Sequence, residues 1–152
     1  MAKSLTSVRT VASQRTSTAT TIVAVLLVVY WLLLFCGTHI RIPKGMLPGQ
    51  SDKLIHFASY AVLGMLLMSL RATRGIYPWY SVFARWFVLS GYGAFDELTQ
   101  LLVNRNADVV DWLADNVGAA VGLGFVTLIL WLFRKSVRSP SPDSPAARTA
   151  QD

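Results

Sequence analysis

Hydrophobic residues gather in four long runs separated by short polar stretches. The runs cover residues 20–37, 54–70, 80–103 and 109–133. A helix rises about 1.5 Å per residue, so about 17 to 25 residues cross a hydrocarbon core about 30 Å thick. Each run is long enough to do so. The pattern predicts an all-α, polytopic membrane protein, with a bundle of four transmembrane helices inside a domain that covers residues 20–135.

The chain on either side of this domain has a different composition. Residues 1–19 are rich in Ser, Thr and Arg and contain no acid, and residues 136–152 are rich in Pro and Ser. Such segments do not bury a hydrophobic core, so we expect a disordered tail at each end. The first apolar run lacks a convincing small-residue cleavage site near its end, which favours an uncleaved anchor helix over a signal peptide.

Composition and charge support this interpretation. Of the 152 residues 53% are hydrophobic and only 14% are charged, which is too apolar for an ordinary soluble domain. Ten of the 14 Lys and Arg residues lie on the side of the two termini, so the positive-inside bias predicts that both termini are cytoplasmic. The net charge of +6 follows from this asymmetry and does not indicate a nucleic-acid partner.

Three of the predicted helices carry ionisable residues at the other, non-cytoplasmic end. Asp52, His56 and Tyr60 recur at intervals of four and share one helix face. On the fourth predicted helix, acids follow each other by three and four positions from Asp108 to Asp115. Lipid cannot satisfy such groups, so we expect them to point toward one another or into a water-filled recess.

The candidate binding residues at this end come from three helices and one loop. They are Asp52, Lys53, His56, Tyr60, Asp96, Glu97, Gln100, Arg105, Asp111 and Asn116.

Small residues predict where helices approach closely. Gly118 and Gly122 form a small-xxx-small pair on the fourth predicted helix, and Gly91 and Gly93 lie on the third. Such residues let helix backbones come together in a membrane. We therefore expect the third and fourth helices to pack tightly just below the polar residues.

Two stretches resemble a known family. They are "DKLIHFASYAVLGMLL" (52–67) and "YGAFDELTQLLVNRNADVVDWLADNVGAAVG" (92–122), and both resemble the VanZ-like family of small bacterial membrane proteins. The resemblance places the candidate residues and Gly118 at motif positions. It differs in the loop around Arg105, where the family more often has Pro-Gly before the arginine. It implies a multi-pass protein of the bacterial cytoplasmic membrane, linked to the cell envelope and to teicoplanin resistance, with no established reaction.

Three functions are compatible with these residues. In the first, Arg105 and Lys53 bind the phosphate or carboxylate of a membrane lipid or a lipid-linked cell-wall precursor. In the second, the protein is a membrane-embedded enzyme, since His56 and the acids offer the imidazole and carboxylates that divalent metals accept. The third function is structural, with the polar groups pairing between helices.

The sequence favours the binding function over the other two. It contains no H-E-x-x-H motif, no cysteine pair and no nucleophile with a positioned partner. No catalytic residue, cofactor or metal is therefore assigned from the sequence, and the oligomeric state is left open.

Overall fold

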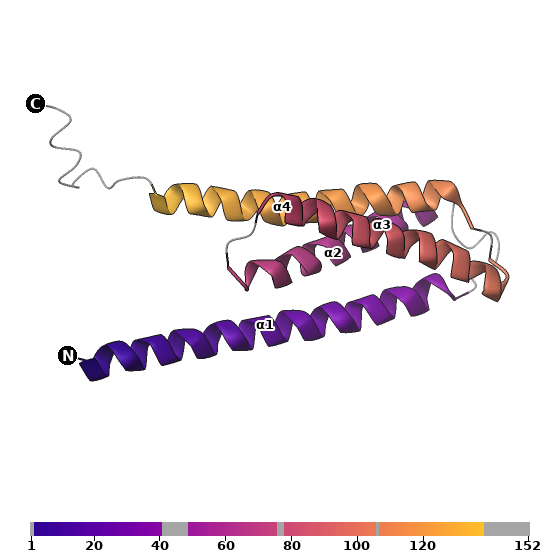
Figure 1. Cartoon of the computed structure of the whole chain (residues 1–152). Coiled ribbons are helices and arrows are strands. Elements are labelled where there is room, and N and C mark those ends of the chain that lie inside the picture. The colour runs from indigo at the N-terminus through magenta and orange to yellow at the C-terminus, as the bar shows by residue number, and fades with distance from the viewer. Residues whose placement is uncertain (1, 41–48, 76–77, 106, 139–152) are drawn as a thin grey trace, which may run out of the picture.

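The computed structural model describes residues 2–40, 49–75, 78–105 and 107–138, and within these ranges all regular structure is helical (Figure 1). α1 begins and α4 ends at the same end of the bundle. The predicted all-helical fold is confirmed. The elements are α1 (Ala2–Thr38), α2 (Gly49–Ala72), α3 (Tyr80–Gln100), the short 3-10 helix η1 (Leu101–Val103) and α4 (Val109–Arg138).

Three of the four helices are long and apolar enough to cross a membrane. The stretches concerned are Thr18–Thr38 in α1, Asp52–Ala72 in α2 and Val109–Arg134 in α4. α3 is not among them, because every 18-residue stretch of this helix contains Arg85, Asp96 and Glu97. The chain is a multi-pass membrane protein with three candidate spans.

The helices extend beyond the predicted domain at both ends. α1 begins at Ala2 and so includes residues 2–19, for which the sequence predicts a disordered tail. No Pro or Gly occurs before Gly37, so no residue in this segment interrupts the helix. α4 continues to Arg138, and the rest of the predicted C-terminal tail, residues 139–152, lies outside the described residues.

α2 and α4 approach until their backbones touch. A Cβ atom added to Gly64 of α2 would lie 2.8 Å from a backbone carbonyl oxygen of α4. Added to Gly118 or Gly122 of α4, it would overlap the carbonyl groups of Phe57 and Ala61 in α2. Only glycine allows this approach, so these positions fix how the two helices meet.

The close contact between α2 and α4 corrects the prediction that these glycines bring α3 and α4 together. Gly118 and Gly122 face α2 rather than α3, and Gly91 has open space beside it. Of the four predicted packing glycines, only Gly93 lies between α3 and α4, where a Cβ would come within 3.3 Å of α4 side chains. Bulky groups also separate these two helices, since the indole of Trp86 donates a hydrogen bond of 3.1 Å to an α4 carbonyl. The spacing of small residues predicts close approach but does not identify the helix that approaches.

Side chains of α1 join it to the bundle. The Tyr30 hydroxyl donates to the Ser59 carbonyl of α2 at 3.0 Å. The ring of Trp31 meets the ring of Tyr92 in α3 edge to face, with centroids 5.0 Å apart. The α2–α4 pair is therefore the rigid centre of the fold, and α1 lies against it.

The glycine contact between α2 and α4 predicts different effects on stability for two substitutions in α4. Gly122→Ala should destabilise the protein by about 1–3 kcal/mol or more, because the added methyl group meets the Ala61 carbonyl. Gly124→Ala should be neutral or slightly stabilising, because nothing lies within 4 Å and alanine is the better helix former. Thermal unfolding in detergent measures both. Equal melting temperatures for the two variants would contradict the backbone contact.

Candidate functional site

Polar side chains gather where α1 and α3 end and where α2 and α4 begin. We call this group the polar cluster, and it contains the sequence-predicted candidates together with Thr38, His39, Asp108 and Asp115. Seven of the predicted residues are buried: His56, Tyr60, Asp96, Glu97, Gln100, Asp111 and Asn116. The other three, Asp52, Lys53 and Arg105, are half-buried.

Lys53 ties the start of α2 to the start of α4. Its ammonium group donates hydrogen bonds to Asp108 Oδ2 at 3.0 Å and to Asp111 Oδ1 at 2.9 Å. The backbone N–H of Val110 also donates to Asp108, and together with Lys53 it holds the pKa of Asp108 below its usual range. Asp108 thus caps α4 and pairs with the lysine at the same time.

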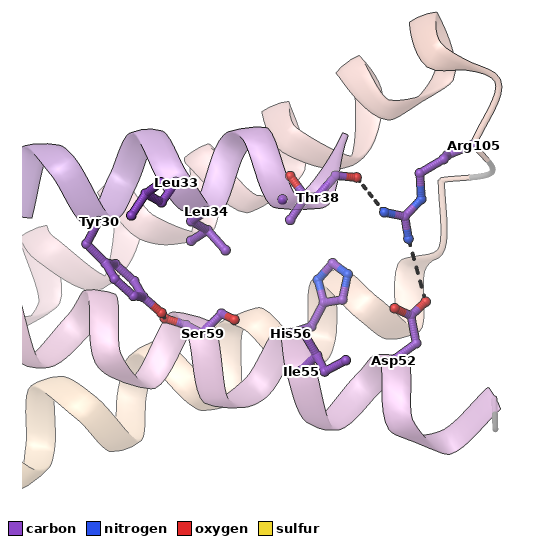
Figure 2. Close-up of a pocket in the computed structure, with 10 residues that line it drawn as sticks. Tyr30, Leu33, Leu34, Thr38, Asp52, Ile55, His56, Ser59 and Arg105 are labelled. Atoms are coloured by element: carbon purple, nitrogen blue, oxygen red, sulfur yellow. Dashed lines mark hydrogen bonds and ion pairs between the residues drawn. The ribbon is translucent and has the colours of Figure 1, made fainter. Parts of the chain in front are cut away.

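Arg105 reaches from the α3–α4 loop to the two other helices of this end. Its guanidinium donates to the Thr38 carbonyl of α1, and it lies 3.8 Å from Asp52 Oδ2 of α2 (Figure 2). Asn104 makes the preceding turn with a φ of 54°. Asparagine is among the few residue types that adopt this left-handed conformation readily, so the turn forms without the Pro-Gly that the family resemblance leads one to expect.

Asp96 is satisfied by the C-terminal end of α1. Its Oδ1 accepts a hydrogen bond of 3.0 Å from the Thr38 hydroxyl, and its Oδ2 accepts one of 3.4 Å from Gln100. His39 Nδ1 lies 3.8 Å from the same carboxylate. A fully buried acid inside an apolar bundle is thus tolerated because α1 supplies donors.

His56, Glu97 and Asp115 form a buried group within the cluster. His56 Nδ1 lies 3.0 Å from Asp115 Oδ1 and 4.0 Å from Glu97 Oε1. The other Glu97 oxygen accepts a hydrogen bond of 2.8 Å from the Asp108 backbone N–H. Glu97 Oε1 and Asp115 Oδ2 have no hydrogen-bond partner among the described residues.

A groove runs between α1 and α2 and ends at the cluster (Figure 2). Its volume is about 310 Å³. One end is polar, and the wall away from that end is largely apolar. It is lined by Tyr30, Leu33, Leu34, Gly37, Thr38, Asp52, Ile55, His56, Ser59 and Arg105.

The side chains of two predicted residues make neither a hydrogen bond nor an ion pair with the other described residues of the cluster. The Asn116 amide donates to the Trp112 carbonyl of its own helix at 2.7 Å. The ring of Tyr60 stacks on Tyr92 with centroids 6.0 Å apart, and its hydroxyl has no partner in the described part of the chain. Within the cluster, Asn116 therefore belongs to the α3–α4 contact and Tyr60 to the aromatic packing with Tyr92.

Four residues of the cluster are absent from the sequence-predicted set, and one of them, Asp108, begins the stripe of acids on α4. Asp115 belongs to the same stripe of acids as Asp111, so its spacing already pointed to the cluster. Thr38 and His39 follow directly after the first apolar run. Two polar residues at the end of the predicted anchor helix were the sequence signal that could have indicated them. Their roles depend on α1 packing beside α3, which no local pattern indicates.

Comparison with known proteins identifies the family. No curated protein and no solved structure matches the chain. A family model described as VanZ/LLP1 matches residues 5–133, which include α2, α3, the polar cluster and most of α1 and α4. Since the match covers most of the chain, the protein belongs to the VanZ/LLP1 family.

Proposed function

We propose that the protein binds an anionic lipid, either a membrane phospholipid or a lipid-linked cell-wall precursor, in the groove between α1 and α2. The observation that carries this proposal is that one groove combines a guanidinium group at its polar end with an apolar wall (Figure 2). A lipid has the same division into a charged head and an apolar chain.

Arg105 is the residue best suited to bind the head group. A guanidinium has five N–H donors. Among the described residues, those of Arg105 engage only one backbone carbonyl and one carboxylate 3.8 Å away. Lys53, by contrast, is held by two acids at 2.9 and 3.0 Å. The sequence offered both cations for this role, and the ion pairs favour Arg105. Its planar fork suits phosphate and carboxylate oxygens.

The apolar wall is open to the lipid phase. The side chain of Leu33 is 64% exposed and that of Ile55 is 48% exposed. In a bilayer these surfaces contact hydrocarbon, so an acyl or prenyl chain along the groove replaces other lipid without exposing apolar surface to water. The groove therefore suits a ligand that stays in the membrane.

The same proposal includes an orientation in the membrane. All four helices cross the bacterial cytoplasmic membrane, both termini are cytoplasmic and the polar cluster lies at the outer face. Support comes from the Lys and Arg asymmetry and from the shared end at which α1 begins and α4 ends (Figure 1). In α3, Asp96 and Glu97 are buried in the bundle, so neither faces lipid. This position is next to lipid-linked wall precursors, in keeping with the implied link to teicoplanin resistance.

Removal of the guanidinium should release the lipid. Charge-assisted hydrogen bonds contribute about 1.5–3 kcal/mol, so Arg105→Ala should reduce the amount of co-purified anionic lipid about tenfold or more. Arg74→Ala is the matched control, because it removes an exposed arginine at the opposite end of the bundle. Mass spectrometry of the detergent-purified proteins measures the retained lipid and names its class.

Two outcomes would count against the proposal. If Arg105→Ala retains as much lipid as the control variant, the head group does not bind at Arg105. If the wild-type protein retains no anionic lipid at all, the polar cluster serves only to join the helices, which is the structural alternative.

Filling the groove should also reduce the amount of bound lipid, without any change of charge. Leu33→Trp places an indole in the groove, whereas Leu32→Trp changes a neighbouring exposed leucine that does not line it. We expect several-fold less bound lipid for the first variant and no change for the second. Equal lipid content in the two purified variants would place the ligand elsewhere.

The proposed orientation can be tested with single cysteines in a Cys36→Ser background. Ala107→Cys is exposed at the cluster end, and Arg74→Cys is exposed at the opposite end. A membrane-impermeant maleimide should label the first variant in intact spheroplasts and the second only after the membrane is opened. The reverse pattern would place the cluster on the cytoplasmic side.

A further inference from the structure

Three groups in the buried part of the polar cluster are of the kinds that bind divalent cations. We propose that His56, Glu97 and Asp115 form a binding site for one divalent cation of the Mn²⁺ or Zn²⁺ class. This inference does not depend on the proposed lipid function, because the groove residue that binds the head group, Arg105, is not one of the ligands.

The three side chains converge on one point. One ligand atom from each lies within 4.8 Å of the others. Metal–ligand bonds of about 2.0–2.2 Å place the donors of a tetrahedral site about 3.3 Å apart. The observed separations of 3.0 and 4.0 Å from His56 Nδ1 bracket this value. Small side-chain movements therefore suffice to close the site around a cation.

Charge balance singles out Glu97 and Asp115 as the acids that need a cation. The lysine and the arginine of the cluster pair with other carboxylates. Asp96 accepts hydrogen bonds from a hydroxyl and an amide. Among the described residues, His56 is the only ion-pair partner of Glu97 and Asp115. A protonated imidazole balances one negative charge but not two. A divalent cation with neutral His56 balances both, which is what burial of two carboxylates requires.

Two buried carboxylate oxygen atoms give independent support for a cation site. Glu97 Oε1 and Asp115 Oδ2 are buried without a hydrogen-bond partner in the described ranges, and their residues are only 5% and 0% exposed. A buried carboxylate oxygen without a donor is costly, and a bound cation removes that cost. The Asp108 backbone N–H holds the other Glu97 oxygen at 2.8 Å, as second-sphere donors orient metal ligands.

A second set of possible ligands shares His56 but is less favourable. Asp52, His56 and Asp111 also bring their donor atoms within 4.8 Å of one another. However, Asp52 already faces Arg105 and Asp111 already accepts from Lys53 at 2.9 Å. A cation at this position would have to displace both partners, so the buried set is the favoured site.

The donor set indicates the class of cation. One imidazole nitrogen and two carboxylates suit Mn²⁺ and Zn²⁺, whereas soft metals prefer thiolates. Cys36, the only cysteine, is exposed on α1 and is not part of the set.

The test uses the full-length protein in detergent, stripped with a chelator and then titrated with Mn²⁺ or Zn²⁺ alone. We expect one cation per chain for the wild type by elemental analysis. Glu97→Gln and Asp115→Asn should each weaken binding by at least about tenfold, since even second-sphere changes cost this much. Asp143→Asn is the control, because it makes the same kind of substitution at an aspartate that is not part of the polar cluster.

The results separate this inference from the lipid proposal. Arg105→Ala should lose lipid and keep the cation, and Glu97→Gln should lose the cation. The inference is overturned if the chelated wild type binds no cation, or if folded Glu97→Gln and Asp115→Asn bind as tightly as Asp143→Asn.

A measurement on proteins with all three ligands intact covers the case in which the acid variants do not fold. Pulsed electron paramagnetic resonance of bound Mn²⁺ should show coupling to a directly coordinated imidazole ¹⁴N in the wild type. The signal should persist in His39→Gln, which removes the only other histidine. Absence of the coupling, or its loss in His39→Gln, would overturn the assignment to His56.

Discussion

The hydrocarbon core of a bilayer offers no hydrogen bonds, so polar groups buried at the cluster end of the bundle need partners within the protein. This constraint determines how the helices meet. Lys53 of α2 requires the acids that begin α4, Asp96 of α3 requires the end of α1, and Arg105 of the loop requires both α1 and α2. The polar residues therefore specify the arrangement of the four helix ends.

Two kinds of contact hold the bundle, and they differ in how easily they can change. α2 and α4 meet through glycines, where any added atom meets backbone. α1 is attached by side chains such as Tyr30 and Thr38, whose hydrogen bonds can be exchanged for bonds to a ligand. The groove lies along the exchangeable contact. A rigid pair of helices thus supports the buried acids, and the more weakly attached helix borders the proposed lipid site.

Much of this arrangement was predictable from residue spacing. Intervals of three and four placed His56 and the acids on inward faces, because lipid excludes them from outward ones. The partner of each residue was not predictable. Gly118 and Gly122 predicted a close helix neighbour, yet their spacing is the same whether that neighbour is α2 or α3. The contribution of Thr38 was missed for a related reason, since it depends on contacts 58 positions apart along the chain.

The exposed wall of the groove determines how a ligand arrives. Leu33 and Ile55 are exposed, so they leave the groove open along an apolar side. In the proposed orientation this side faces the hydrocarbon phase. A lipid that occupies it diffuses within the plane of the membrane. Occupancy then depends on the mole fraction of that lipid among its neighbours, and not on any aqueous concentration. A minor lipid is held only if Arg105 distinguishes its head group from those of the abundant lipids around it.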